Sequence, residues 1–321
     1  MAIEGDVRFS SNAAGRLEIR NVGAIAGKII VEDNDALEAL QLETDYAGIP
    51  LPDGASTSLI LRNALALTQV SGGAAGAFVT VEMRDVSALD NVSLPNLPPP
   101  RRLSVVNAKA LSTFNLGSAS SPKNAIAGTI ELRDVGLPNL DAFFRGGMKG
   151  QNISVAGTLN VEVIRYGLVN AMNVSISTKG PVGLSVVLGN SKDIDGENPP
   201  SDSRVEFLEV SAVREFAGEG DNFLAPSVGT FTIRDTELSH PVVRFKDLNN
   251  LVVHNNLLLK DIHHGDDFAR YSWKSISIKN NPSWIPEIRH GGDPEKEGGW
   301  VWPEGTVESV ELVGHFERDI L

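Results

Sequence analysis

The stretch "KDIHHGDDF" holds the densest cluster of side chains that could do chemistry: Asp261, His263, His264, Asp266 and Asp267. Imidazole and carboxylate groups bind divalent metal ions and also act as general acids and bases. The alternative is a solvated connection between two strands, in which Gly265 makes the turn. The sequence has no second cluster of metal ligands. We therefore predict a connection without a metal, and retain His263, His264, Asp266 and Asp267 as the weaker metal hypothesis.

Aromatic side chains give a second candidate site. Trp300 and Trp302 lie in the glycine-rich segment "EKEGGWVWPEG". Flat aromatic rings could stack on sugar rings and contact a glycan. The alternative, which we favour, is that these rings close the open end of a core against water.

Three N-glycosylation sequons occur, beginning at Asn91, Asn152 and Asn173. They predict glycan attachment if the chain passes through a secretory pathway.

Motifs of nucleophilic and cofactor-dependent catalysis are missing from the sequence. It contains no G-x-S-x-G, no H-E-x-x-H, no P-loop and no dinucleotide fingerprint. We therefore assign no catalytic residue and no cofactor. A carbohydrate-active enzyme stays the alternative, because a lyase, hydrolase or epimerase on a β-helix needs outward carboxylates on adjacent repeats. Glu18, Glu82 and Glu131 are the outward candidates, and the last two fall on non-adjacent repeats.

A repeated template must position these residues. Apolar side chains occupy offsets 0, 2 and 8 of each copy, and Asn or Asp occupies offset 4, as in Ile276, Ile278, Asn280 and Trp284. The offset-4 residues of the copies are Asn21, Asp33, Asn63, Asp85, Asn107, Asp134, Asp235, Asn255 and Asn280. Positions 63, 85 and 107 are 22 residues apart. A period of this length is typical of solenoids, in which one supersecondary unit fills each repeat.

Parity assigns a direction to each offset. Side chains at offsets 0 and 2 share one face of a strand, which must be the core, and offset 3, often Arg, points outward. Offset 4 has the inward parity, so we expect its Asn or Asp to bond the backbone groups freed at the corner. On this view Asn280→Ala is costly and Asn281→Ala is mild. Asn and Asp alternate along the first six copies, and an Asn can donate to carboxylates on both neighbours.

The pattern predicts an all-β fold, a right-handed parallel β-helix or leucine-rich-repeat-like solenoid. We expect two short helices, at 37–42 and 140–144. No linker divides residues 1–321, so we predict one domain, with two similar halves of about 1–150 and 151–321 as the alternative.

Composition excludes several classes of function. The net charge of −13 repels phosphate backbones and anionic membranes, so we expect no nucleic-acid partner. No apolar run approaches the roughly 20 residues that span a bilayer. Cysteine is absent, which excludes disulfides, cysteine-ligated zinc and thiol nucleophiles.

The repeats "SISIKNNPSWIPEI" and "LVVHNNLLLKDI" resemble those of receptor L-domains, and are most similar to those of fungal GPI-anchored proteins of cell-wall organisation and sporulation. "LPNL", which occurs twice, "IEGDVRF" at 3–9 and "VELVGHF" at 310–316 resemble further motifs of that family. The resemblance implies a secreted, wall-attached, non-enzymatic glycoprotein with a wall polysaccharide or surface protein as partner.

The sequence departs from that family in three respects. Cysteine is absent, and we find neither a secretion signal nor a Ser/Thr-rich stalk with an apolar anchor tail. The last two departures fit a trimmed chain. An intracellular solenoid with an unrelated partner stays open as an alternative.

Overall fold

A computed structural model places the chain in 23 β-strands, with no helix among the residues it describes. Two compact units divide the chain, Met1–Val161 and Glu162–Leu321. The described residues are 5–11, 13–20, 25, 27–43, 57–72, 78–94, 100–116, 128–136, 150–157, 163–166, 170–178, 185–188, 204–211, 223–238, 242–259, 263–264, 274–283, 288–289, 300–301 and 309–313.

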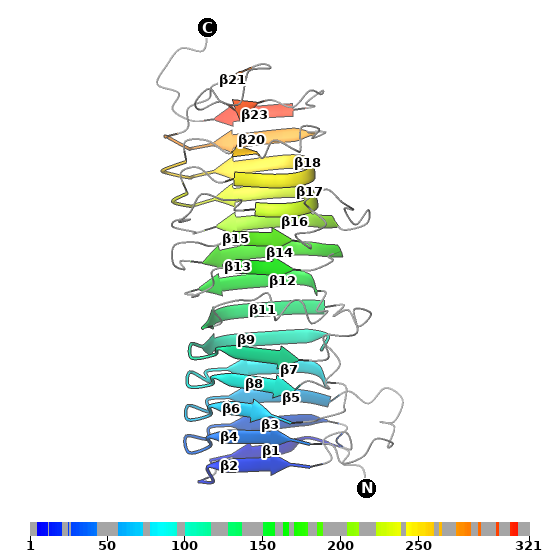
Figure 1. The fold of residues 1–321 in the computed structure, drawn as a ribbon, viewed down its shortest axis with the longest axis vertical. Helices are drawn as coiled ribbons and strands as arrows, with labels where there is room; N and C mark the ends of the chain where they lie inside the picture. The colour runs from blue at the N-terminus through cyan, green and yellow to red at the C-terminus, as the bar shows by residue number, and fades with distance from the viewer. Residues whose placement is uncertain are drawn as a thin grey trace. The chain divides into compact units, whose positions relative to one another are not determined.

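The first unit contains a long parallel sheet (Figure 1). Its strands, in spatial order, are β1 (Val7–Ser10), β3 (Lys28–Glu32), β5 (Thr57–Arg62), β7 (Phe78–Arg84), β9 (Arg102–Ala108), β11 (Gly128–Val135) and β12 (Gly150–Gly157). Offset-0 residues Ile29, Leu59 and Val81 pair in register and are fully buried. Offset-2 residues pair in the same way, so the inward assignment of both offsets is confirmed.

A second parallel sheet returns the chain within the first unit. It runs in the order β2 (Arg16–Ile19), β4 (Ala39–Leu42), β6 (Gln69–Ser71), β8 (Asn91–Leu94) and β10 (Thr113–Leu116). Leu40, Val70 and Val92 form its fully buried inward column. The offset-8 leucines Leu37, Leu67, Leu89 and Leu111 fill the space at the corner. Two sheets thus enclose one apolar core over about five turns, which is a parallel β-solenoid.

The helix expected at 37–42 is wrong. Its residues form a turn followed by strand β4, and Leu37, Leu40 and Leu42 are all buried. A turn followed by an alternating strand gives apolar spacings of three and two, which resemble one helical turn over so short a segment. The other expected helix, at 140–144, lies outside the described residues.

The template copy at Leu17, Ile19 and Asn21 belongs to the second sheet. Leu17 pairs with Leu40, and Ile19 pairs with Leu42. The corner of the first strand is instead Ser11, which follows β1. Both sheets alternate apolar and polar residues, so the pattern alone could not separate them. Asn21 itself lies outside the described residues.

The second unit is also parallel throughout the pairings that the structure describes. One run of strands is β14 (Asn170–Thr178), β16 (Arg204–Ser211), β17 (Phe223–Arg234), β18 (Val242–His254), β20 (Ser275–Lys279) and β23 (Ser309–Val313). Beside it, β13 (Val163–Tyr166) pairs with β15 (Ser185–Leu188), β15 pairs with the start of β17, and β19 (His263–His264) pairs with the start of β18. A separate pair joins β21 (Ile288–Arg289) to β22 (Trp300–Val301). Phe231, Leu251 and Ile276 form a buried inward column.

Nine of the described corners turn at the residue four positions after the first inward residue of the strand, and this residue has a left-handed backbone. The φ angle lies between 51° and 58° at Asp33, Asp85, Asn107, Asp134, Asp235, Asn255 and Asn280, and is 49° at Asn63 and at Ser11. Asn and Asp adopt this conformation more readily than other residues with a side chain. The main-chain N–H of Asn63 donates to the carbonyl of Arg84 (3.1 Å), so the corner residue continues the hydrogen bonding between rungs.

The inward direction expected for offset 4 is wrong. Asp33, Asn63, Asp235, Asn255 and Asn280 are exposed, whereas Asp85, Asn107 and Asp134 are half-buried. The following residue is the buried one: Asn34, Ala64, Val86, Ala108, Val135, Thr236, Asn256 and Asn281. Parity holds only while the backbone is extended. A left-handed residue breaks the alternation and directs its successor into the core.

We therefore predict that Asn281→Ala is the costly substitution. Asn281 donates to the carbonyls of Val253 (2.8 Å) and Lys279 (3.1 Å), and its oxygen accepts from the main-chain N–H of Asn256 (2.9 Å). Leaving these buried groups without partners costs about 1–3 kcal/mol of unfolding free energy. The denaturant midpoint of each variant measures this cost.

Glycine substitutions provide the matched control. Asn280→Gly keeps the left-handed corner, so it should be milder than Asn280→Ala, which costs about 1 kcal/mol. At position 281, Gly and Ala should be equally damaging. Rescue by glycine at 281 rather than 280 would contradict the assigned corner.

Candidate functional site

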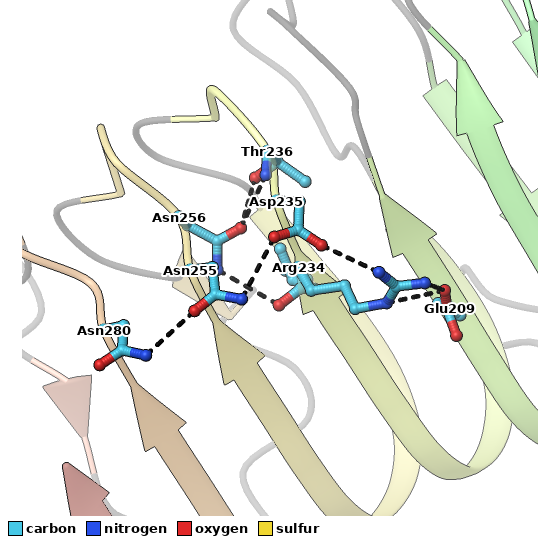
Figure 2. Close-up of polar contacts among 8 residues, drawn as sticks. Glu209, Arg234, Asp235, Thr236, Asn255, Asn256 and Asn280 are labelled. Carbon is cyan, nitrogen blue, oxygen red and sulfur yellow. Dashed lines mark hydrogen bonds and ion pairs between the residues drawn. The ribbon is translucent and has the colours of Figure 1, made fainter. Parts of the chain in front are cut away.

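Exposed amide and carboxylate groups line the corners. In the second unit, Asn280 Nδ2 donates to Asn255 Oδ1 (3.1 Å), and Asn255 Nδ2 donates to Asp235 Oδ1 (3.2 Å), as Figure 2 shows. In the first unit, Asn63 donates to Asp33 (2.9 Å) and Asn107 donates to Asp85 (2.8 Å). Each of these corner carboxylates therefore faces an amide on the next rung rather than another carboxylate, which avoids repulsion between like charges.

Behind these corners in the second unit lies a buried polar ladder, Thr236, Asn256 and Asn281. Asn256 Oδ1 accepts from the main-chain N–H (3.1 Å) and hydroxyl (2.8 Å) of Thr236 (Figure 2). Asn256 Nδ2 donates to the carbonyl of Ile233 (3.2 Å) and to Asn281 Oδ1 (3.0 Å). We expected the side chain at offset 4 to bond the backbone of the corner, and the side chain at offset 5 does so instead. Asn34 does the same in the first unit, donating to Phe9 (3.0 Å) and Glu32 (2.7 Å).

Arginines at offset 3 point outward, as expected. Arg62 and Arg234 bind carboxylates on neighbouring rungs, whereas Arg133 pairs with Glu131 of its own strand. Arg234 contacts Glu209 through Nε (3.0 Å) and Nη2 (2.6 Å), and Asp235 through Nη1 (2.9 Å) (Figure 2). The bond to Glu209, and then the bond to Asp235, raises the pKa of Arg234. In the first unit, Arg62 holds Glu82 at 2.8 Å. These carboxylates already have cationic partners.

The expected outward carboxylates Glu82 and Glu131 lie on β7 and β11, and β9 separates the two strands. Ser104 of β9 donates to Glu131 (2.9 Å), and Arg133 lies 3.4 Å from the same carboxylate. Glu18, the third candidate, lies on β2 of the other sheet and bonds Arg20 (2.7 Å). The structure does not bring these three side chains together.

Sequence reasoning missed an outward cluster on β18, β20 and β23, formed by His254, Ser277, Lys279 and Glu311. His254 Nε2 lies 2.9 Å from Ser277 Oγ, which lies 3.3 Å from Glu311 Oε2. Lys279 Nζ pairs with Glu311 Oε1 at 2.7 Å. The outward parity of offsets 1 and 3 could have indicated these residues, but their contact depends on which rungs are neighbours.

The order of groups in this cluster differs from that of an activated serine. A nucleophilic serine donates to a base, and a third group orients that base. Here the hydroxyl of Ser277 donates to the carboxylate, so its oxygen accepts from the imidazole. Partial burial, and then the charge of Lys279, lowers the pKa of His254. The hydrogen bond from Lys279 lowers the pKa of Glu311. The lowered pKa values favour a neutral His254 and an ionised Glu311 at neutral pH.

Uncharged polar side chains cover the outer face of part of the second sheet. We call Gln69 and Ser71 of β6, Asn91 and Ser93 of β8, and Thr113 and Asn115 of β10 the neutral array. All six are half-buried or exposed, and they alternate with the buried Val70, Val92 and Phe114. The side-chain oxygen of Asn91 is shielded from solvent and has no hydrogen-bond partner. Asn91, with which the first sequon begins, lies on β8, the middle strand of this face.

Five other sequence candidates have backbones in strands, with side chains outside the described set. Asn152 lies on β12, Asn173 on β14, and Trp300 on β22. His263 and His264 form β19, and Gly265, where we expected the turn, lies outside the described residues. Asp261, Asp266, Asp267, Trp284 and Trp302 fall outside the described residues. Within the described part of the chain, no three His, Asp or Glu side chains gather as metal ligands would.

Comparisons of the chain with protein-family models, with curated proteins and with solved structures find no match. Of the residues that the structure describes, none belongs to a helix long and apolar enough to span a membrane.

We predict that His254 makes folding stability fall on acidification. Its pKa is lowered in the folded state, so the unfolded chain binds more protons once the pH drops below the ordinary value of 6.5. Stability should decline from about pH 6.5 down through the folded pKa. His254→Gln should lose part of this decline, as melting temperatures between pH 7.5 and 5 would show.

Lys279→Gln is the matched variant for the pH measurement. It removes a cation that disfavours the imidazolium, so the pKa of His254, followed by NMR, should move upward while the remaining burial still lowers it. A wild-type His254 that titrates above its ordinary value would contradict the assignment.

Proposed function

We propose that this protein is a non-catalytic scaffold of the cell surface or cell wall that binds glycan or protein along the outer faces of its sheets. The observation that carries the proposal is the in-register stacking of outward polar residues. Parallel strands about 4.8 Å apart repeat each outward side chain on a rigid backbone. Such a surface is ordered before binding, so a ligand that matches its spacing loses little free energy to ordering the protein.

The state of the carboxylates supports binding over catalysis. A glycosidase needs one carboxyl group with a raised pKa as general acid and a second across the scissile bond. Glu82 is held by Arg62, Glu209 by Arg234, and Glu311 by Lys279. The pKa of Glu311 is lowered rather than raised. These groups serve as partners in ion pairs.

The location belongs to the same proposal. The resemblance of the repeats to receptor L-domains of fungal wall proteins supports a secreted, wall-attached glycoprotein. Three sequons support passage through a secretory pathway. The partner would then be a wall polysaccharide or a surface protein. Glycans found at the sequons in the native host would distinguish this location from an intracellular one.

We predict binding without turnover. The folded chain should retain polysaccharides or surface proteins of the wall on an array or affinity column, and the same polysaccharides should release no soluble sugar products after long incubation. Product release that Glu82→Gln or Glu131→Gln abolishes would overturn the proposal in favour of a carbohydrate-active enzyme. The pair is matched, since both residues are outward glutamates of one sheet.

A further inference from the structure

We infer that the neutral array is a binding face for an uncharged, polyhydroxylated polysaccharide that lies across strands β6, β8 and β10. This inference rests on the proposed function and names the ligand class and the face. It assigns no role to the outer faces of the other sheets.

The side chains of the neutral array stand in two aligned rows. Gln69, Asn91 and Thr113 are aligned across the three strands, and Ser71, Ser93 and Asn115 form a second aligned row. Neighbouring strands are about 4.8 Å apart, and same-face residues of one strand are about 6.7 Å apart. The array is therefore a small lattice of hydrogen-bonding groups on a flat surface. An extended chain of sugar rings offers hydroxyls at comparable, regular spacing.

The chemistry of the array matches that of an uncharged sugar chain. Amide and hydroxyl side chains both donate and accept hydrogen bonds, as sugar hydroxyls do. The array has no formal charge, although the chain as a whole carries −13. A polyanion would meet the repulsion of that net charge, and a polycation would find no carboxylate within the array. An uncharged ligand is the class that this face complements.

The side chains of the neutral array keep hydrogen-bonding groups that the rest of the protein does not use. On the first sheet of the same unit, the outward Arg62 and Glu82 bind each other, and Ser104 donates to Glu131. Among the described residues, no hydrogen bond joins the side chains of the array to one another, and Asn91 Oδ1 has no partner.

The border of the array supports its extent. On β4, next to β6, Gln41 accepts from Arg16 and donates to Glu43, so its amide is occupied. At the corner before β8, the Asp90 carboxylate accepts from the Ser112 hydroxyl. The polar groups at these borders bond one another. The side chains of the array on β6, β8 and β10 do not, and we assign them to the ligand.

Glycosylation of Asn91 and binding at the array exclude each other, because an attached glycan would cover the face. The assignment therefore requires that Asn91 is unmodified in the native protein. Mass spectrometry of the protein from its host tests this requirement. A glycan at Asn91 in most molecules would overturn the inference and leave the proposed function intact.

The binding test uses the full chain, made without glycans, with a soluble neutral β-1,3-glucan, a neutral mannan and the polyanion polygalacturonate as probes. Asn91→Asp and Asn115→Asp add a carboxylate at nearly constant shape, and Asn115 is exposed, so that its variant should keep the wild-type melting temperature. Ser58→Asp is the matched control, because Ser58 is a half-buried residue of β5 in the other sheet of the same unit.

We expect one neutral polysaccharide to bind and polygalacturonate not to bind. Each array variant should weaken that binding by about tenfold or more, and Ser58→Asp should change it by less than about twofold. Binding that the array variants leave unchanged, or that Ser58→Asp weakens equally, would overturn the inference while preserving a glycan-binding function. Failure of the wild-type protein to bind either neutral polysaccharide would also overturn it, and the proposed function would then require a protein partner.

Discussion

A left-handed backbone conformation at nine corners of the described rungs is the constraint on which the rest of this structure depends. After each strand the chain must turn sharply to place its next side chains in the core, and it must keep its hydrogen bonds to the neighbouring rungs. Asn, Asp and Ser at φ values between 49° and 58° make this turn, and their main-chain N–H groups stay in the ladder. The turn also rotates the next side chain inward, which places Asn256 and Asn281 where they bond buried carbonyl groups.

Once the corners are fixed, parallel register determines the surface. Each outward offset becomes a row, and chemistry within a row depends on which residues happen to be neighbours. On the first sheet of the first unit, Arg62 stands in register with Arg84, and it forms its ion pair diagonally with Glu82 of the neighbouring row. Surface ion pairs of this kind add little to stability, commonly below about 1 kcal/mol each. Their larger effect is to leave few charged groups available for acid–base chemistry.

The two sheets of the first unit share this backbone geometry but differ in their outer faces. One face carries charged side chains that form ion pairs, such as Arg62 with Glu82, whereas β6, β8 and β10 carry amides and hydroxyls that do not bond one another. Because inward positions are filled by Val70, Val92 and Phe114, these polar residues contribute nothing to the core. The His254 cluster, in contrast, has its hydrogen bonds and its charges matched within the protein.

The sequence by itself determined the solenoid, because the apolar offsets 0, 2 and 8 are local properties of each rung and recur every 20 to 30 residues in the clear copies. It also determined that offset 4 is special and that Arg at offset 3 points outward. It did not determine which way offset 4 points, because parity assumes an extended backbone and Asn280 is left-handed. Nor could it place Leu17 and Ile19, since both sheets show the same alternation and only hydrogen-bond register separates them. His254 and Ser277 are 23 residues apart, and Ser277 and Glu311 are 34 residues apart. Because these separations differ, the sequence does not indicate that the three side chains meet, and only the stacking of the rungs decides it.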